Sequence, residues 1–502
     1  MTNSTRPRYE PSPYDAAIVT IPALSGDRST WMPLISCPAS FPAELFEIAV
    51  SQLIHHPEYN STLILRSDTV AEYNSDFPDA IPEIKGLRPV RVVHRKLLPR
   101  RPGRDASLEQ YCTLYGVVDP DSDPLNTLIL TPIVPPGGSL PYYHPTVSHL
   151  AFRYIPSDPP TLRMEVVPLP GTPTDMNSRL YRTCLALLDT LDRYGWGAVT
   201  NYKKRVIHDY LVPRDTYQDL YLIMRERHKH LVDTWQEVTD PLKHVFEDIG
   251  IATYLMLLWK ASYPLAVNTE KADNDEPQPW KDWPRPPGGF LDFGCGNGLL
   301  THILVTEGYE GKGIDLRART SWTHYPALTQ THLHVHAFDP ATPPADDPYF
   351  KSGVFIIGNH ADELTPWVPV LATLHAASGY LSIPCCAWTF DAKYERSSTP
   401  MFPIPRQDFA DTLNLGGEGG NGSSYSMYRI WLASLSLHCG WEVECETLRI
   451  PSTRNWAIIG RKMLEARDAQ DNVRVILSNV LERGLFKARA PEGKSGGSSK
   501  LH

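Results

Sequence analysis

A glycine-rich segment directly after an apolar run is the part of the chain best suited to bind a ligand. Residues 290–298 read Phe-Leu-Asp-Phe-Gly-Cys-Gly-Asn-Gly, and helical periodicity follows over residues 299–307. The pattern predicts a buried strand that turns sharply into a helix, with glycines where the backbone approaches a ligand or adopts a positive φ. The first N–H groups of that helix can bind a polar ligand. Asp315 ends the next predicted strand, where an acid can hold ribose hydroxyls.

The glycine spacing distinguishes between two classes of nucleotide-like cofactor. Residues 294–298 form G-x-G-x-G with an acid two positions before the first glycine, whereas dinucleotide-binding folds have G-x-G-x-x-G. The segment resembles the first motif of class I methyltransferases that depend on S-adenosylmethionine (AdoMet). The resemblance implies AdoMet as cofactor, with binding residues expected at Asp292, Gly294, Cys295, Gly296, Gly298, Asp315, Asp339 and Asn359.

Two of these acids also have a purely structural interpretation. Asp292 either orients the amino group of the methionine part or anchors the turn. Asp339 follows the third predicted strand, where a polar side chain can bind the adenine amine, but Asp339-Pro340 is equally a turn sequence.

The fourth strand of such a sheet ends close to the reacting methyl group, because ligands gather at the carboxyl ends of parallel strands. Here the chain reads Gly-Asn-His-Ala-Asp-Glu over residues 358–363, without the Asn/Asp-Pro-Pro-aromatic motif typical of amine methylation. We therefore expect a hydroxyl acceptor, which needs a base or a charged neighbour. His360 and Asp362 are the catalytic candidates; the alternative is that Asp362 caps the helix beginning near Leu364. The Lys-Asp-Lys-Glu set of many ribose methyltransferases is not evident.

We expect no metal site. His332, His334 and His336 alternate along a predicted strand, but no acid or cysteine is spaced to complete a zinc shell, so an exposed strand face is favoured. Cys385 and Cys386 are adjacent, and adjacent strand residues point to opposite faces, so packing near the cofactor is favoured over shared ligation.

The composition is that of a globular protein from a reducing compartment. The chain has 502 residues, 42% of them hydrophobic and 21% charged, which suggests more than one domain. Its eight cysteines form no C-x-x-C pair, which argues against a disulfide framework and a zinc ribbon and fits a reducing compartment, cytoplasmic or nuclear. No signal peptide or membrane span is apparent, so we expect no membrane partner.

The distribution of charge indicates a nucleic-acid partner more than the net charge of −9 does. Eight basic residues and no acid lie between Lys85 and Arg104, and a second basic run follows at Lys203-Lys204-Arg205. Each run alone is typical of a solvated face, and two runs make contact with a phosphate backbone an equal alternative. The candidate RNA-binding residues are Arg100, Arg101, Arg104, Lys203, Lys204 and Arg205.

The expected architecture is α/β, a seven-stranded class I (Rossmann-like) methyltransferase domain over residues 288–465, preceded by a mixed α+β region. We expect disorder over residues 1–15, an α+β region with a tRNA-binding role over 16–200, a helical connection over 201–266 and an acidic, proline-rich linker over 267–287. A C-terminal helix and a disordered tail are expected over 466–502.

Several segments together resemble one family, the eukaryotic tRNA (uracil-2′-O-)-methyltransferases that act on uridine 44 of serine tRNA. The resemblance covers residues 200–462 and implies AdoMet-dependent methylation of a tRNA ribose 2′-hydroxyl in the cytoplasm. Two rival functions stay open: a class I methyltransferase with a protein or small-molecule acceptor, and a catalytically silent RNA-binding scaffold. The matching segments are Tyr202–Asp209, Asp240–Ile249, Leu291–Leu300, Gly313–Arg319, Ile357–Trp367 and Ile383–Cys386.

Overall fold

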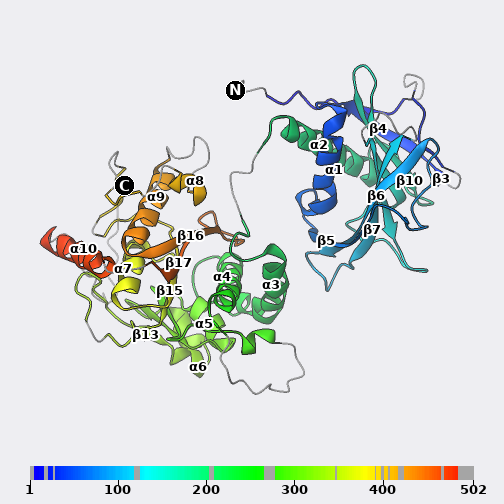
Figure 1. Cartoon of the computed structure of the whole chain (residues 1–502). Coiled ribbons are helices and arrows are strands. Elements are labelled where there is room, and N and C mark those ends of the chain that lie inside the picture. Colours follow the sequence, from blue (N-terminus) through cyan, green and yellow to red (C-terminus); the bar gives the residue numbers. More distant parts are fainter. Residues whose placement is uncertain are drawn as a thin grey trace, which may run out of the picture. The chain divides into compact units, whose positions relative to one another are not determined.

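The chain forms two compact units, Met1–Lys203 and Lys204–His502, each with its own sheet and core (Figure 1). The computed structural model describes residues 5–15, 21–26, 29–117, 125–202, 208–264, 278–344, 347–390, 392–396, 401–404, 408–415, 423–464 and 468–483. Lys203, Lys204 and Arg205 and residues 265–277 and 484–502 lie outside these ranges.

The first unit contains an eight-stranded, fully antiparallel sheet in the order β1-β4-β10-β9-β8-β7-β6-β5. Two helices, α1 and α2, pack on it, and β2 pairs with β3 as a separate ribbon. The elements are β1 (Ser12–Pro13), β2 (Ser25–Gly26), β3 (Ser29–Thr30), β4 (Met32–Pro38), η1 (Ala43–Leu45), α1 (Phe46–His55), η2 (Pro57–Tyr59), β5 (Ile64–Tyr73), β6 (Leu87–Pro99), β7 (Leu108–Val117), β8 (Thr127–Ile133), β9 (Val147–Ile155), β10 (Thr161–Pro168) and α2 (Arg179–Val199).

The helices of this unit bury one face of the sheet. Alternate side chains such as Leu162, Met164 and Val166 of β10 join the apolar residues of α1 and α2 in one core. Ser178 accepts a hydrogen bond from the Tyr181 N–H and so caps the start of α2. The described part of the N-terminal segment is ordered against this unit, contrary to the disorder expected for residues 1–15. Arg6 donates to Asp189 and Asp192, and β1 pairs with β4.

The second unit is built around a seven-stranded sheet in the order β13-β12-β11-β14-β15-β17-β16, parallel except that β17 is antiparallel to both its neighbours. Its strands are β11 (Phe290–Phe293), β12 (Gly311–Asp315), β13 (Leu333–Val335), β14 (Phe355–Asn359), β15 (Gly379–Ile383), β16 (Trp441–Thr447) and β17 (Trp456–Met463). Its helices are α3 (Arg214–His228), η3 (Lys229–Val232), α4 (Pro241–Ser262), η4 (Pro279–Asp282), α5 (Leu299–Thr306), η5 (Thr320–His324), α6 (Ala327–Gln330), η6 (Asp362–Leu364), α7 (Trp367–Leu374), α8 (Phe409–Thr412), α9 (Ser424–His438) and α10 (Ala469–Arg483).

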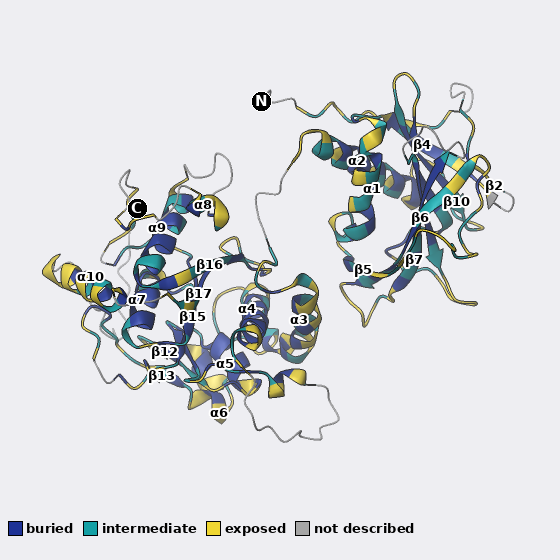
Figure 2. Ribbon diagram, in the orientation of Figure 1, coloured by how far each residue is buried: buried dark blue, intermediate teal, exposed yellow. Residues whose placement is uncertain are grey.

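Helices cover both faces of this sheet, so its central strands are apolar on both sides. Phe355 and Ile357 of β14 pack with α3, α4 and α5, whereas Ile356 packs with α7, α9 and α10. Figure 2 shows these strands buried and the outward helix faces exposed. Asp240 and Pro241 form the start of helix α4: the Asp240 side chain accepts a hydrogen bond from Leu242 N–H, and Pro241 occupies the first turn.

The region expected to connect the domains belongs to the second unit's core. Helix α4 packs along α5 and the sheet, with thirteen of its side chains and Gly250 buried between Val245 and Trp259. Trp280, expected within the linker, is fully buried and donates to Glu307 at 2.9 Å. Among the described residues, no helix combines the length and the apolar composition needed to cross a lipid bilayer.

Candidate functional site

The glycine segment forms a tight turn between β11 and α5. Gly294, Gly296 and Gly298 have φ values of 83°, 54° and 75°, a left-handed conformation that costs other residues about 1–2 kcal/mol each. The N–H groups of Gly294 and Cys295 both donate to the Ile314 carbonyl, at 2.9 and 3.0 Å. The turn is therefore fixed to the end of β12.

Gly298 also has no room for a side chain. A Cβ there would lie 2.8 Å from Leu333 and 3.2 Å from the Trp322 indole nitrogen. A Cβ at Gly294 would meet Leu364 and Ala361, in the segment after β14, at ordinary contact distances. The glycine turn and the end of β14 are thus neighbours.

Asp315 holds the turn from the β12 side. Its Oδ2 accepts from the Gly296 N–H at 2.9 Å. The turn carbonyls are bonded by the segment after β12: Trp322 donates to Gly296 O at 2.9 Å and Ser321 to Asn297 O at 2.8 Å. The Cys295 side chain packs with Trp322 and Leu333, so its thiol is buried in a small apolar cluster.

Asp292 is a buried carboxyl directly beneath the turn. The Thr301 hydroxyl of α5 donates to its Oδ2 at 2.8 Å. Burial raises the pKa of Asp292 to about 7, and the neighbouring charge of Asp315 contributes, although the Thr301 hydrogen bond opposes the shift. Near neutral pH this carboxyl can therefore gain or lose its charge when a charged ligand binds.

Two acidic residues of α4 hold two consecutive residues at the end of β14. Asn359 Nδ2 donates to Asp248 Oδ1 at 3.2 Å, and His360 Nε2 lies 3.0 Å from Glu247 Oε1. Sequence reasoning missed both acids as site residues. Their signal was a pair of carboxylates within the otherwise apolar stretch of residues 245–259, which has to bury them.

The pKa values of the two acids, Asp248 and Glu247, are shifted in opposite directions. Burial raises the pKa of Asp248 well above its usual value, as do the charges of Asp292 and Glu247. Burial also opposes ionisation of Glu247, but the hydrogen bond and charge of His360 outweigh it and hold the Glu247 pKa below its usual value. Glu247 is thus the ionised partner of His360.

The end of β14 also presents acceptor atoms that lack partners. Asn359 Oδ1 and His360 Nδ1 are buried without a hydrogen-bond partner in the described part of the chain. Such atoms are costly unless a ligand satisfies them. His360 has a φ of 51°, and strained backbone of this kind is concentrated at functional sites. AdoMet, with its ribose, carboxylate and ammonium groups, fits this donor and acceptor set.

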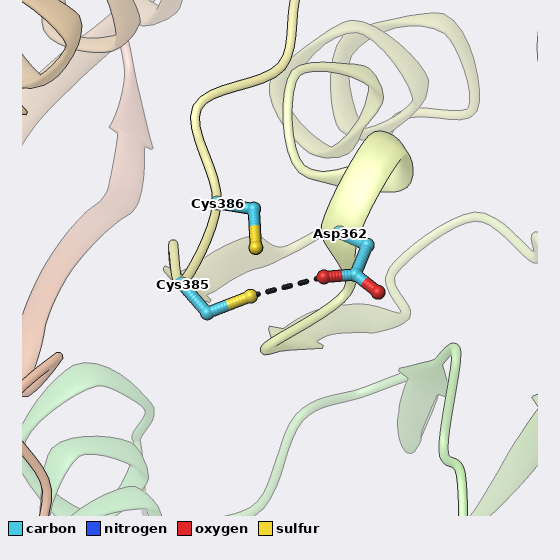
Figure 3. A group of neighbouring side chains, drawn as sticks. All are labelled: Asp362, Cys385 and Cys386. Carbon is cyan, nitrogen blue, oxygen red and sulfur yellow. Dashed lines mark hydrogen bonds between the residues drawn. The ribbon is translucent and has the colours of Figure 1, made fainter. Parts of the chain in front are cut away.

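Asp362 does not cap a helix, contrary to the structural alternative considered for it. It begins the short turn η6, its φ is 44°, and α7 starts only after Pro366. Its Oδ1 instead accepts from the Cys385 thiol at 3.1 Å (Figure 3). Burial raises the pKa of that thiol, and so does Asp362.

Cys385 and Cys386 do not point to opposite faces, contrary to the expectation from strand alternation. The alternation of strand side chains ends with β15 at Ile383, and both sulfur atoms lie within 4.8 Å of the Asp362 carboxylate and of each other. The histidines near β13 behave differently: His332 bonds the Gly311 carbonyl and His336 bonds Asp347, and no metal-ligand group includes them among the described residues.

The adenine-binding candidate Asp339 is engaged in its own turn. Its Oδ1 accepts from Ala341 N–H and its Oδ2 from the Thr342 hydroxyl, both at 2.9 Å. This geometry is that of the Asp-Pro turn, although each carboxylate oxygen retains capacity for a further hydrogen bond.

The basic run of the first unit is divided between surface and core. Arg100, Arg101 and Arg104 are exposed in the turn between β6 and β7. Arg95 is 3% exposed and donates to Gln110 and to the carbonyls of Leu53 and Ile54, so it cannot contact RNA. Lys203, Lys204 and Arg205 lie outside the described residues.

Comparison with known proteins identifies both units. Residues 10–205 match a family model described as a TRM44-like, N-terminal bet v1-like domain, and residues 211–275 and 280–340 match one described as a predicted AdoMet-dependent methyltransferase. The tRNA (uracil-O(2)-)-methyltransferase of Schizosaccharomyces pombe is 36% identical over 475 residues, 86% of each chain. This chain belongs to that family.

Other members of the family also match this chain over most of its length. The enzyme of the same name from Neurospora crassa is 34% identical and covers 90% of this chain and 91% of its own length. The Saccharomyces cerevisiae enzyme is 28% identical, with 84% and 85% covered. No solved structure shows significant similarity to the chain. The protein is thus an AdoMet-dependent methyltransferase with a bet v1-like first unit.

Proposed function

We propose that this protein transfers a methyl group from AdoMet to the ribose 2′-hydroxyl of a uridine in tRNA, and that the nucleotide is uridine 44 of serine tRNA. The observation that carries the proposal is the glycine turn with Asp315, set beside the unpartnered acceptor atoms of Asn359 and His360. The names of the family members supply the tRNA uracil nucleotide as acceptor. The nucleotide position follows from the sequence resemblance.

The catalytic domain, residues 288–465, is of the class I type in this proposal. The order β13-β12-β11-β14-β15-β17-β16 supports it, because β11 and β14 are neighbours at the centre, where the strand order reverses. Ligands of open α/β sheets bind at this reversal point, outside the carboxyl ends of the strands. The cofactor turn after β11 and the segment after β14 both lie at that edge.

The cofactor-binding roles follow from the chemistry of each group. The backbone of residues 294–298 lies next to the methionine part, Asp292 binds its ammonium group and Asp315 binds the ribose hydroxyls. Asp339 accepts from the adenine amine, and Asn359 presents Oδ1 to the ligand. AdoMet, when bound, supplies an electrophilic methyl group.

His360 is the residue of this site that contacts the acceptor hydroxyl. Glu247 accepts a hydrogen bond from Nε2–H, so in the neutral imidazole Nδ1 carries no proton and can accept a hydrogen bond from the 2′-hydroxyl. Two fixed ring contacts define the tautomer and orientation of a catalytic imidazole. Asp362 is the second catalytic candidate. Its carboxylate lies next to the two thiols, and its negative charge assists deprotonation of the acceptor hydroxyl.

In this proposal the tRNA backbone contacts the first unit and the basic segment where the sequence passes from the first unit to the second. Arg100, Arg101 and Arg104 are exposed side by side in one turn, and Lys203, Lys204 and Arg205 add a second basic segment. Binding through phosphates predicts an affinity that falls steeply with salt. The eight cysteines are all free, in keeping with our proposal that the enzyme acts in the cytoplasm.

Asp315→Asn tests the cofactor site. The amide keeps an acceptor for the Gly296 N–H but removes the charge that strengthens hydrogen bonds to ribose, a loss of about 1.5–3 kcal/mol, or roughly 10- to 100-fold in affinity. Isothermal titration with AdoMet measures it, and the exposed Asp471→Asn on α10 is the matched control. Equal affinity in wild type and Asp315→Asn would remove the cofactor assignment.

The acceptor is tested with methyl-labelled AdoMet. Label should enter total tRNA from cells that lack the enzyme, and should not enter protein extract or small metabolites. Label in protein or metabolites would establish the other class of methyltransferase. AdoMet binding without turnover on any RNA would establish a silent scaffold.

A further inference from the structure

Three potential metal ligands converge where the neighbouring parallel strands β14 and β15 end. Asp362 follows β14, Cys385 and Cys386 follow β15, and their ligand atoms all lie within 4.8 Å of one another. In Figure 3 the two sulfur atoms and the carboxylate face one another across the gap between the two chain segments. We propose that Cys385, Cys386 and Asp362 bind one Zn²⁺ ion.

The donor set selects the type of metal. Thiolate sulfur favours zinc and other thiophilic ions, whereas magnesium and calcium take oxygen ligands. Zinc binds sulfur at about 2.3 Å and carboxylate oxygen at about 2.0–2.2 Å, which places tetrahedral ligand atoms roughly 3.4–3.8 Å apart. The present cluster reaches that spacing by small side-chain rotations, since Cys385 Sγ and Asp362 Oδ1 are already 3.1 Å apart. Each thiol releases its proton to solvent as the zinc–sulfur bond forms.

The local backbone is shaped for this convergence. Asp362 has a φ of 44°, in the left-handed region, and this conformation directs its carboxylate toward β15. The chain departs from strand geometry after Ile383, which lets two adjacent cysteines face the same side. Strain of about 1–3 kcal/mol at a residue such as Asp362 persists where function requires it.

The other cysteines do not resemble this pair. Five of the remaining six are buried, and Cys445 lies within β16. Cys386 is exposed and Cys385 is partly exposed, so both can reach an ion from solvent. Two accessible thiols beside a carboxylate are a metal-binding arrangement more than a packing one.

Three protein ligands leave one position for an oxygen ligand, which is the pattern of catalytic rather than structural zinc. Water fills that position in the free protein. Exchange of the water for a substrate hydroxyl rests on the proposed function, because His360 and the glycine turn lie at the same edge of the sheet. The binding of zinc itself does not depend on it.

The metal content of the full-length chain tests the proposal directly. The protein is purified without chelator, freed of any histidine tag and dialysed, and its zinc is measured by inductively coupled plasma mass spectrometry. We expect about one zinc per chain in the wild type and in Cys445→Ser, and a loss of at least tenfold in Cys385→Ser/Cys386→Ser. Replacement by Co²⁺ should give a thiolate-to-cobalt charge-transfer band that the double variant lacks.

Asp362→Asn should retain the thiolate band but lose Co²⁺ at lower chelator concentration than the wild type. An unchanged far-ultraviolet circular dichroism spectrum in each variant shows that the fold is intact. Wild-type protein with no more zinc than the double variant, or zinc that stays in the double variant, would overturn the proposal. So would a denatured thiol count of six rather than eight, because a disulfide between the adjacent cysteines would then account for the cluster.

Discussion

We predict that the buried carboxyl of Asp292 makes AdoMet binding depend on pH and that Asp292→Asn removes this contribution. With a pKa of about 7, the carboxyl is mostly neutral at pH 6 and mostly ionised at pH 8. The cationic methionine ammonium favours the ionised form, so that form is the one that binds. The variant retains an acceptor for the Thr301 hydroxyl but carries no charge at any pH.

The magnitude follows from the fraction of ionised carboxyl. About one-tenth of the molecules are competent at pH 6 and about nine-tenths at pH 8, so the apparent Kd falls about tenfold between them. The asparagine variant stays near the weak end of this range throughout.

Isothermal titration at pH 6, 7 and 8 in buffers of matched ionic strength measures this dependence. The ammonium of the ligand also titrates, at a pKa of about 8, which weakens its pairing with the carboxylate at pH 8, so the comparison between pH 6 and pH 7 isolates the titration of Asp292 most cleanly. Parallel curves for wild type and Asp292→Asn would refute the reasoning and leave Asp292 as an anchor of the turn.

The raised pKa of Asp292 also makes the stability of the folded protein depend on pH. The folded-state pKa of Asp292 lies above the ordinary value of 3.8, so the folded protein holds the proton more tightly. The tighter proton binding stabilises the folded state fully below about pH 4, and this stabilisation is lost as the pH rises through about 7. The free energy of unfolding lost over this range is up to about 4 kcal/mol for a three-unit pKa shift. Asp292→Asn should therefore gain stability relative to wild type between pH 5 and pH 8 in thermal denaturation without ligand.

Three further changes test separate parts of the structure. Gly298→Ala should lose about 1–3 kcal/mol in denaturant unfolding and most AdoMet affinity, because its Cβ would lie 2.8 Å from Leu333; equal stability would refute the steric argument. Glu247→Ala should lower kcat about 10- to 100-fold with little change in AdoMet affinity, since it releases the His360 ring; a normal kcat in single-turnover assays would contradict this. Charge reversal of the three exposed arginines in the β6–β7 turn should weaken tRNA binding and reduce the dependence of the affinity on salt, as measured by filter binding. Unchanged affinity across the salt series would show that these arginines do not contact tRNA.

The strands of the second unit were predictable because they are buried on both faces. Residues 290–293 and 355–359 read as short, nearly continuous apolar runs, as expected of parallel strands between two helical layers. The glycine spacing then located the tight turn between β11 and α5, since few residues other than glycine tolerate the positive φ that it needs.

The sheet of the first unit was less visible in the sequence. Strand β6 carries four basic residues within Leu87–Pro99, which resembles a charged surface segment. Arg95 is nevertheless buried, because Gln110 of β7 and two carbonyls at the end of α1 satisfy its guanidinium. Those partners are set by tertiary packing and cannot be read from local sequence.

The site residues that were missed share this cause. Glu247 and Asp248 are more than a hundred positions from Asn359 and His360, and only the packing of α4 on the sheet brings them together. The two thiols were misjudged because the rule of alternating faces was applied beyond the end of β15.

Methylation of a defined serine tRNA tests the central claim most directly. A transcript with an unmodified uridine 44 is incubated with the enzyme and AdoMet, and a second transcript differs only by a 2′-deoxy nucleotide at that position. Nuclease mapping with mass spectrometry should find one methyl group on the ribose of nucleotide 44 in the first and none in the second. A methyl group on a base, at another position, or in equal amount on the deoxy transcript would contradict the account.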